Sequence, residues 1–341
     1  MNLDSPLVTL PDIALRKVLE QCGYMGIQSL RKTCHDLRSF IDDSSLELDV
    51  KSVTIILHPH INSFQYTQGN LEKIRIEYHH EHQSCGITRV DKDVEAQRSL
   101  FSKFTLDGLN YLDVFKKDLA TFFKTLNGQK APLEELRFMK RSPPLDETPM
   151  EDLTVLKDSL NSGKLLKVLS MFLKGQRESE FLSVLSVVDP KFIKSLHLAS
   201  SSCCMPLEVD EIAKLEQWKA VRNLIISPQF HVENVRQFMH FRDALIVVKV
   251  ISREDIAAML SRFRSSNPPK SFKVGYASRE TSGVHGVFEK APSVRNRSSK
   301  FEWYFKNTTT GNVVHVISSA HDIHFKTMKL SSVPSNVLVY E

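Results

Sequence analysis

The sequence predicts an α/β fold in which a short module of three helices precedes an irregular stack of β/α units. Two patterns lead to this prediction. Apolar residues recur with helical spacing near the N-terminus, and a short string of the form L-x-x-L-x-L recurs through the rest of the chain. The 341 residues are 41% hydrophobic and 25% charged, which is typical of globular rather than disordered chains.

The first helix is expected to begin at Pro11 and Asp12. Proline suits a first helical turn because it has no N–H to leave unpaired, and an acidic side chain there complements the helix dipole. Gly23 favours a stop. One face of each helix carries apolar residues at intervals of three and four: Leu15, Val18, Leu19 and Cys22 in the first, Ile27, Leu30 and Cys34 in the second, and Leu37, Phe40 and Ile41 in the third.

A module this short needs support from elsewhere. Seventeen of the 35 residues from Leu7 to Ile41 are apolar, yet modules of fewer than about 40 residues seldom bury enough surface alone. The five cysteines form no C-x-x-C pair, so neither a disulfide framework nor a four-cysteine zinc site is expected. The module therefore packs either on the rest of the chain or on another protein.

The repeated strings predict buried strands separated by helices. They begin at Leu71, Leu133, Leu166, Ile193, Val221, Leu245 and, more weakly, Pro269, and from Leu133 onward they recur every 24 to 33 residues. Helical patterns separate the later strings, at 207–219, 231–241 and 252–263, where Ser252 and Asp255 resemble a helix-start cap. Such alternation indicates parallel strands in stacked β/α units, an irregular leucine-rich-repeat-like solenoid, with an irregular α/β domain as the alternative.

The expected organisation has four parts. The helical module occupies 5–45, and 50–130 forms the first part of the β/α domain, with a long helical insertion at 93–127. Residues 131–290 hold the repeats, and 291–341 supply C-terminal strands that close the same domain.

Two stretches resemble known families. Leu10-Pro11, Val18-Leu19 and the segment LRKTCHDLRSFIDD from Leu30 resemble an F-box, especially that of a large family expanded in nematodes. The chain departs from many F-boxes at Ile13 and Ala14, where these have an acid and a larger apolar residue. The strings EQWK at Glu216, FMHF at Phe238 and ISREDI at Ile251 resemble the FTH domain of the same family, over roughly 150–290.

These resemblances imply a protein that binds other proteins and is not itself an enzyme. F-boxes bind the Skp adaptor of SCF-type ubiquitin ligases, and through it a cullin. The FTH domain would then recruit a protein target through contact residues that the resemblance does not identify. The F-box resemblance assigns the adaptor surface to six residues: Leu10, Pro11, Val18, Leu30, Cys34 and Leu37.

No local motif indicates catalysis, a cofactor or a metal. His79, His80, His82 and Cys85 lie close together, but no second ligand pair follows at a zinc-like spacing, and they are expected at the turn after a strand. Near the C-terminus, His321, Asp322 and His324 fit either an acid/base group or an edge strand. Cys203 and Cys204 are expected in a loop, without a neighbouring cation that would activate a thiol.

The location and three alternative functions complete the expectations. No apolar run is long enough for a membrane helix, and Asp4 and Asp12 fall where a secretory signal would be apolar, so an intracellular protein is expected, cytoplasmic or nuclear. Residues 261–300 hold nine Lys/Arg and two acids, which leaves a nucleic-acid binder using 262–300 as an alternative, although the aromatic residues there match core positions. A protein-interaction scaffold that does not lead to ubiquitination, or a site assembled from distant residues, also remains open.

Overall fold

A computed structural model describes residues 7–44, 46–69, 72–82, 84–93, 98–140, 156–160, 164–200, 205–228, 230–279, 288, 294–295, 300–335 and 337–340. The chain divides into two compact units. Unit 1 comprises residues 1–171 and 179–193, and unit 2 comprises residues 172–178 and 194–341.

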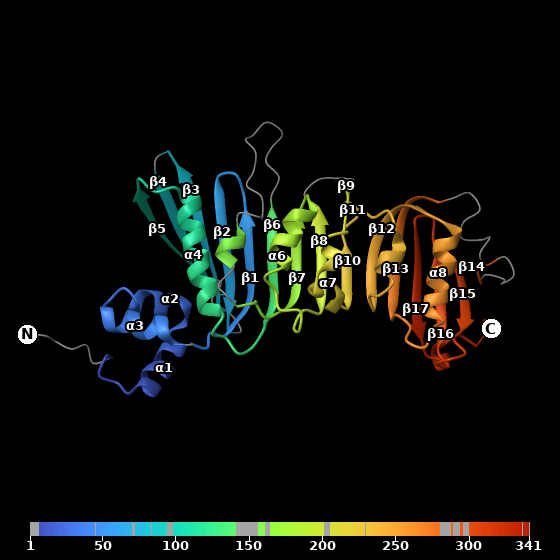
Figure 1. The fold of residues 1–341 in the computed structure, drawn as a ribbon, viewed down its shortest axis with the longest axis horizontal. Coiled ribbons are helices and arrows are strands. Elements are labelled where there is room, and N and C mark those ends of the chain that lie inside the picture. The colour runs from blue at the N-terminus through green and yellow to red at the C-terminus, as the bar shows by residue number, and fades with distance from the viewer. Residues whose placement is uncertain are drawn as a thin grey trace, which may run out of the picture. The chain divides into compact units, whose positions relative to one another are not determined.

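Unit 1 begins with the three expected helices (Figure 1). They are α1 (Asp12–Gln21), α2 (Gly23–Leu30) and α3 (His35–Asp43). The start at Asp12, directly after Pro11, confirms the predicted beginning of the first helix. The prediction was wrong for Cys34, which does not belong to the second helix. It precedes α3, where its sulfur accepts a hydrogen bond from the backbone N–H of Leu37 at 3.5 Å.

The sheet of unit 1 combines parallel pairing at β1 and β6 with an antiparallel meander. Its strand order is β7-β6-β1-β2-β3-β4-β5. The strands are β1 (Val50–Leu57), β2 (Ile61–Gln68), β3 (Glu72–Glu81), β4 (Ser84–Asp93), β5 (Arg98–Asp107), β6 (Leu133–Lys140) and β7 (Val168–Gly175), which extends into unit 2. Strand β1 pairs in parallel with β6 and antiparallel with β2, and β2 to β5 pair antiparallel in succession.

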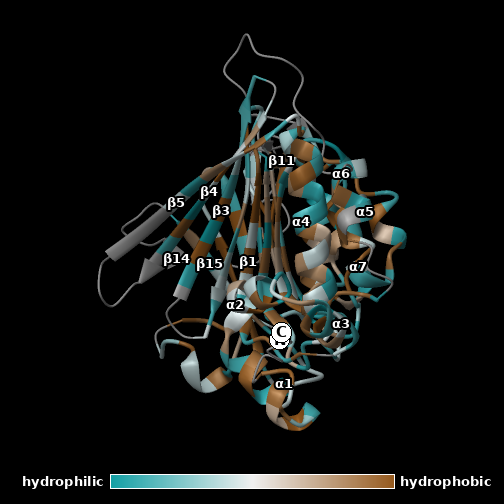
Figure 2. Ribbon diagram, turned by 90° about the vertical axis from the view of Figure 1, so that its left-hand side faces the viewer, coloured by the Kyte–Doolittle hydropathy of each residue, from teal (hydrophilic) through white to brown (hydrophobic). Residues whose placement is uncertain are grey.

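A long helix covers this meander. Helix α4 (Tyr111–Leu126) packs on β2, β3 and β4 and lies beside the short α5 (Lys157–Leu160) (Figure 2). The side chain of Asn110 starts it by accepting hydrogen bonds from the N–H groups of Leu112 and Asp113, at 2.8 and 3.4 Å. Its buried face is strongly aromatic and consists of Phe115, Leu119, Phe122, Phe123 and Leu126. Helix α6 (Glu178–Leu185) contributes Glu180, which forms a buried ion pair with Lys140 at 2.9 Å.

The predicted helical insertion is only partly present. Residues 111–126 form α4, but residues 98–107 form β5, so the helical expectation was wrong there. The physical reason is that β5 pairs with β4 along its whole length, from Arg98 opposite Asp93 to Asp107 opposite Ser84.

Unit 2 contains a run of parallel strands followed by antiparallel ones. Its strand order is β8-β10-β12-β13-β17-β16-β15-β14, with β8, β10, β12 and β13 parallel to one another. The strands are β8 (Ser195–Ser200), β10 (Asn223–Ile226), β12 (Asp243–Ile251), β13 (Ser271–Arg279), β14 (Val294–Arg295), β15 (Phe301–Lys306), β16 (Val313–Ser318) and β17 (Asp322–Met328), with β9 (Met205–Pro206) and β11 (Phe230–His231) as a separate pair.

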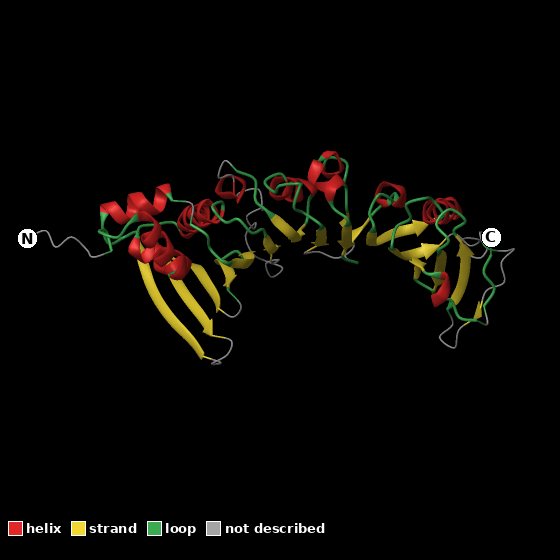
Figure 3. Cartoon of the chain, turned by 90° about the horizontal axis from the view of Figure 1, so that it is seen from below, coloured by secondary structure: helices red, strands yellow, loops and turns green. Residues whose placement is uncertain are grey.

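Short helices connect the parallel strands on one face (Figure 3). They are α7 (Glu216–Ala220) and α8 (Arg253–Phe263), with the 3-10 turns η2 (Ile212–Lys214) and η3 (Val235–Phe238). A further 3-10 turn, η4 (Leu330–Ser332), follows the antiparallel strand β17. The expected cap of α8 is confirmed as a reciprocal capping box between Ser252 and Asp255. Trp218 is a core residue, and its ring packs edge-on against Phe241 at 5.0 Å between centroids.

All seven repeat strings mark strands, but the first, at Leu71, lies in β3, which is antiparallel to both neighbours and not part of a parallel run as expected. Each of the seven L-x-x-L-x-L strings coincides with or overlaps one of β3, β6, β7, β8, β10, β12 and β13. The protein is therefore a mixed α/β fold with parallel and antiparallel strands. A parallel run of strands with short helices is common to many α/β proteins, so the finer classification as a leucine-rich-repeat-like solenoid stays a prediction.

Candidate functional site

The N-terminal module of α1, α2 and α3 is the first candidate site. Each helix buries two apolar side chains: Leu15 and Leu19 in α1, Tyr24 and Ile27 in α2, and Leu37 and Ile41 in α3. The spacing of four or three residues within each pair places both members on one helical face. The opposite faces remain available for other contacts.

Tyr24 attaches this module to the sheet and helix of unit 1. Its ring is only 4% exposed and packs edge-on against Phe122 of α4 and Tyr66 of β2, at 4.8 and 5.7 Å between centroids. Its backbone N–H donates to the side-chain oxygen of Gln68 at 3.2 Å. Burial raises the pKa of the Tyr24 hydroxyl. The module therefore obtains part of its missing support from its own chain.

The junction between α1 and α2 requires glycine. Gly23 has φ +63°, a left-handed conformation that other residues adopt only with strain. A Cβ atom at this position would lie 2.9 Å from the amide atoms of Gln68, which is the residue that accepts the Tyr24 hydrogen bond. The backbone turn and the docking of Tyr24 thus depend on the same position.

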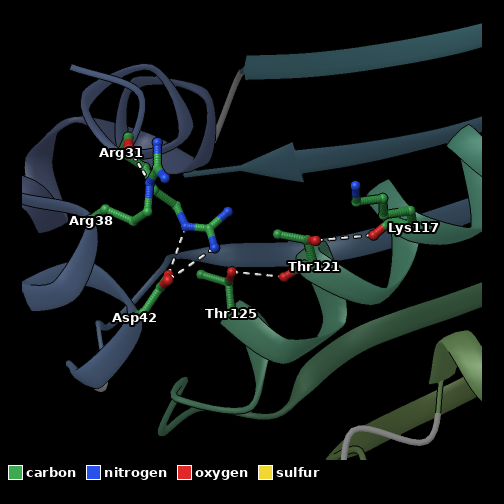
Figure 4. A network of polar contacts seen from close by, with 6 residues as sticks. All are labelled: Arg31, Arg38, Asp42, Lys117, Thr121 and Thr125. Atoms are coloured by element: carbon green, nitrogen blue, oxygen red, sulfur yellow. Dashed lines mark hydrogen bonds and ion pairs between the residues drawn. The ribbon is translucent and has the colours of Figure 1, made fainter. Parts of the chain in front are cut away.

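An ion pair fixes the C-terminal end of α2 against α3 (Figure 4). The Arg31 guanidinium donates to both carboxylate oxygens of Asp42, at 2.6 and 2.9 Å, and Arg38 donates from its Nε to the Arg31 carbonyl at 3.2 Å. The hydrogen bond between them raises the pKa of Arg31 and lowers that of Asp42. Both side chains are about one-third exposed, so the pair contributes at most about 1 kcal/mol.

A cleft of about 370 Å³ lies between this ion pair and α4. On the α4 side, Thr121 and Thr125 donate from their hydroxyls to carbonyls one turn earlier on their own helix, at 3.0 and 2.9 Å (Figure 4). The bonds drawn in Figure 4 hold the helices, and the Lys117 ammonium takes part in none of them. The cleft therefore separates packed helices, and among its described lining residues no nucleophile is paired with a base.

Helix α1 leaves apolar side chains on the surface. Ile13 is 76% exposed and Val18 is 39% exposed, and the adjoining Pro11 is exposed as well. Among the described residues of the module, Ile13 and Val18 are the exposed large apolar side chains. These two exposed apolar side chains are candidates for contact with another protein.

The six residues expected on the adaptor surface fall into three groups. Pro11 and Val18 are exposed, Leu10, Leu30 and Cys34 are half-buried, and Leu37 is buried in the module. The sequence-based set omitted Ile13, the most exposed apolar side chain of the module. The sequence did contain a signal for its exposure, because Ile13 does not have the spacing of three or four residues that would place it on the buried face with Leu15 and Leu19.

Comparison with models of protein families assigns the two main segments. An F-box domain matches residues 7–49, which contain α1, α2 and α3. An FTH domain matches residues 151–291, which contain the parallel strands β8, β10, β12 and β13. The chain is an F-box protein with an FTH domain. Neither a comparison with curated proteins nor one with solved structures yields a match.

The histidine-rich segment of this F-box protein forms part of the meander. Ile74, Ile76 and Tyr78 are buried along β3, and of the four candidate ligands only His82 lies in the following turn, with φ +32°. His79 and His80 belong to β3 and Cys85 to β4, so the expected turn position was wrong for these three, because the β3–β4 pairing extends up to the turn. Across the described residues, no group of three or more His, Cys, Asp or Glu side chains is arranged to hold a metal ion. Burial raises the pKa of the Cys85 thiol, which opposes formation of a reactive thiolate.

Of the C-terminal group, Asp322 and His324 belong to strand β17, and His321 directly precedes it. Strand β17 lies between β13 and β16, so the edge-strand interpretation was wrong, because β17 finds an antiparallel partner on each side. His324 forms a hydrogen bond with the Ser271 hydroxyl at 2.8 Å, and His321 is exposed. Burial and nearby lysines lower the pKa of His324 to about 4, so it is neutral near pH 7.

Three further expectations can be placed. The aromatic residues of the basic stretch, Phe263, Phe272, Tyr276 and Phe288, are all buried, which confirms their interpretation as core positions. Cys203 and Cys204 lie outside the described residues. Within the described ranges, every helix is too short or too polar to cross a lipid bilayer.

Proposed function

We propose that this protein is a non-catalytic substrate-recognition subunit of an SCF-type ubiquitin ligase. Its F-box would bind the Skp adaptor, and through it a cullin, while its FTH domain would bind a protein target. The observation that supports this proposal most directly is the F-box match over a module that buries Tyr24 in its own unit and exposes Ile13 and Val18. Ligase subunits of this kind operate in an intracellular compartment.

The chain would contribute proximity and no chemistry of its own. A receptor that holds a target beside the ubiquitin-transfer machinery raises the effective concentration of the target there, and this replaces weak collisions by an intramolecular event. Two buried titratable side chains of the described residues have structural partners, since His324 binds Ser271 and Glu180 pairs with Lys140. This arrangement favours a binding role over an enzymatic one.

The adaptor surface is proposed to include α1 and the residues directly before it. Leu10 and Pro11 precede the helix, and Ile13 and Val18 project from it. Leu30 and Cys34 would contribute partial contacts, whereas Leu37 would act indirectly by holding α3 in place. An interface gains most of its affinity from a few residues that become buried in it, and Ile13 and Val18 are proposed for that role because they are the exposed large apolar side chains of the described module.

The test is the affinity of the purified full chain for purified Skp adaptor, measured by isothermal titration calorimetry. The double variant Ile13→Asp/Val18→Asp should bind at least tenfold more weakly, because two carboxylates would be forced into an apolar contact. Both positions are exposed, so the variant should retain the wild-type fold, which circular dichroism checks.

The matched control is Ile225→Asp/Leu245→Asp, which places the same two carboxylates at apolar positions of unit 2 that are 44% and 36% exposed. This control should bind the adaptor as the wild type does. Equal adaptor binding by the α1 variant and the wild type, or no binding by the wild type, would refute the proposal.

A further inference from the structure

Four consecutive parallel strands of unit 2 are each preceded by a basic residue. Lys194 comes directly before β8, Arg222 before β10, Arg242 before β12 and Lys270 before β13. All four side chains are exposed. The same position of the repeated unit therefore carries a positive charge four times in succession.

The backbone places these residues side by side. The N–H of Arg222 donates to the carbonyl of Lys194 at 2.9 Å, that of Arg242 donates to Arg222 at 2.9 Å, and that of Lys270 donates to Arg242 at 2.7 Å. Adjacent strands are about 4.8 Å apart, so the four residues form a row about 14 Å long at one end of the strands. We call this row, Lys194, Arg222, Arg242 and Lys270, the basic ladder.

A cleft of about 740 Å³ opens along the ladder. It is lined by Arg222, Arg242 and Lys270 and also by Lys219 and Arg262, and no Asp or Glu is among its described lining residues. His240 adds no charge near pH 7, because burial lowers its pKa. Like charges concentrated in one cleft, with no acidic residue in its described lining, attract anions.

The cations of the cleft differ in how they are held. Lys219 pairs with Glu216 at 2.8 Å, and Arg262 is fixed by hydrogen bonds to Ser265 and Asn267, at 2.7 and 2.6 Å. In contrast, within the described ranges no hydrogen bond or ion pair engages the side chain of Arg222, Arg242 or Lys270. The ladder thus keeps its donor groups available for a ligand.

The dimensions and surroundings favour an acidic peptide over a nucleic acid. An extended peptide rises about 3.3 Å per residue, so the ladder matches a segment of about four residues. Single-stranded nucleic acids are bound through exposed aromatic rings on which bases stack. The large exposed apolar side chains in the described part of unit 2 are all aliphatic, and Phe241, the aromatic residue lining the cleft, is buried.

We infer that the basic ladder of the FTH domain binds an acidic, carboxylate-rich segment of a protein target. The guanidinium groups of Arg222 and Arg242 hold the carboxylates in two-point contacts, and Lys270 and Lys194 extend the charged row in both directions. All four residues fall within the FTH match at 151–291. The inference rests on the proposed function, in which the FTH domain is the part that binds the target.

The experiment measures binding of a fluorescein-labelled octaglutamate peptide to the full chain by fluorescence anisotropy. Wild type should bind octaglutamate and not octaglutamine. The variant Arg222→Glu/Arg242→Glu should bind octaglutamate at least tenfold more weakly. Its control, Lys300→Glu/Lys329→Glu, changes the net charge equally at two exposed lysines outside the cleft and should bind within twofold of wild type.

Three results would overturn the inference: octaglutamate bound no better than octaglutamine, an equal loss in the two charge-reversed variants, or tighter binding of an octauridylate RNA than of octaglutamate. Should Arg222→Glu/Arg242→Glu fail to fold, Arg222→Gln/Arg242→Gln removes the charges without reversing them and should also weaken binding. Adaptor affinity measured on the same preparations reports on the proposed function alone, because the F-box is unchanged in every variant.

Discussion

Substitution of Tyr24 by alanine tests how the F-box is attached to the rest of unit 1. The ring is 4% exposed and contacts Phe122 and Tyr66 edge-on, at 4.8 and 5.7 Å between centroids. Removing a buried aromatic ring costs about 3 to 5 kcal/mol of unfolding free energy. The two edge-on pairs account for about 1 to 3 kcal/mol of that loss.

The assay is urea denaturation of the full chain followed by circular dichroism. With a slope of about 1 to 3 kcal/mol per molar urea, a loss of 3 kcal/mol lowers the unfolding midpoint of unit 1 by on the order of 1 M or more. Tyr24→Phe is the matched control. It keeps the ring, and no described residue accepts a hydrogen bond from the Tyr24 hydroxyl, so its midpoint should remain close to that of the wild type.

The reasoning is refuted if Tyr24→Ala unfolds within about 0.2 M urea of the wild type, since that shift corresponds to well under 1 kcal/mol. It is also refuted if Tyr24→Phe is destabilised as strongly as Tyr24→Ala. In that case the hydroxyl, and not the ring contact, would hold the F-box in place.

Three further predictions concern stability. Lys140→Met should destabilise unit 1 by about 3 to 5 kcal/mol in urea unfolding, because it leaves the buried Glu180 carboxylate without its cation. The double variant Lys140→Met/Glu180→Leu should recover most of that loss. A cost below about 1 kcal/mol for Lys140→Met alone would contradict this prediction. Gly23→Ala should lower the thermal unfolding midpoint more than Gly69→Ala. Both glycines have positive φ, but only at Gly23 would an added Cβ lie 2.9 Å from Gln68. Equal shifts of the midpoint would show that the clash with Gln68 contributes nothing. Between pH 6.5 and 4, His324 binds a proton in the unfolded chain but not in the folded chain, where its pKa is about 4. The free energy of unfolding should therefore fall as the pH is lowered through this window. If His324→Gln shows the same dependence of unfolding free energy on pH as the wild type, His324 is not its source.

The sequence predicted best those features that depend on neighbours along the chain. The helical spacing of Leu15 and Leu19, and of Leu37 and Ile41, was sufficient to locate α1 and α3, and Ser252 with Asp255 correctly marked the start of α8. Periodicity predicted the wrong element where one segment fits both a helical and a strand pattern. Leu100, Phe101 and Phe104 satisfy a helical spacing, but the pairing with β4 makes this segment a strand.

The features that sequence could not supply arise from distant contacts. Tyr24 packs on Phe122, far along the chain, and nothing in the local pattern distinguishes it from other apolar residues of the module. The basic ladder was also hidden, because Arg222, Arg242 and Lys270 become neighbours only through the register of their strands. The net charge of the 261–300 stretch drew attention to the segment as a whole and not to these positions.

The docking of Tyr24 has a consequence for how this protein is dissected experimentally. Tyr66 and Phe122 are fully buried, in part by the ring that the F-box supplies. A chain shortened by its first 45 residues would leave these aromatic surfaces bare to water and would tend to self-associate. Loss of a partner from such a truncated protein would then report damage to the remaining fold, whereas surface substitutions on α1 separate recognition from folding.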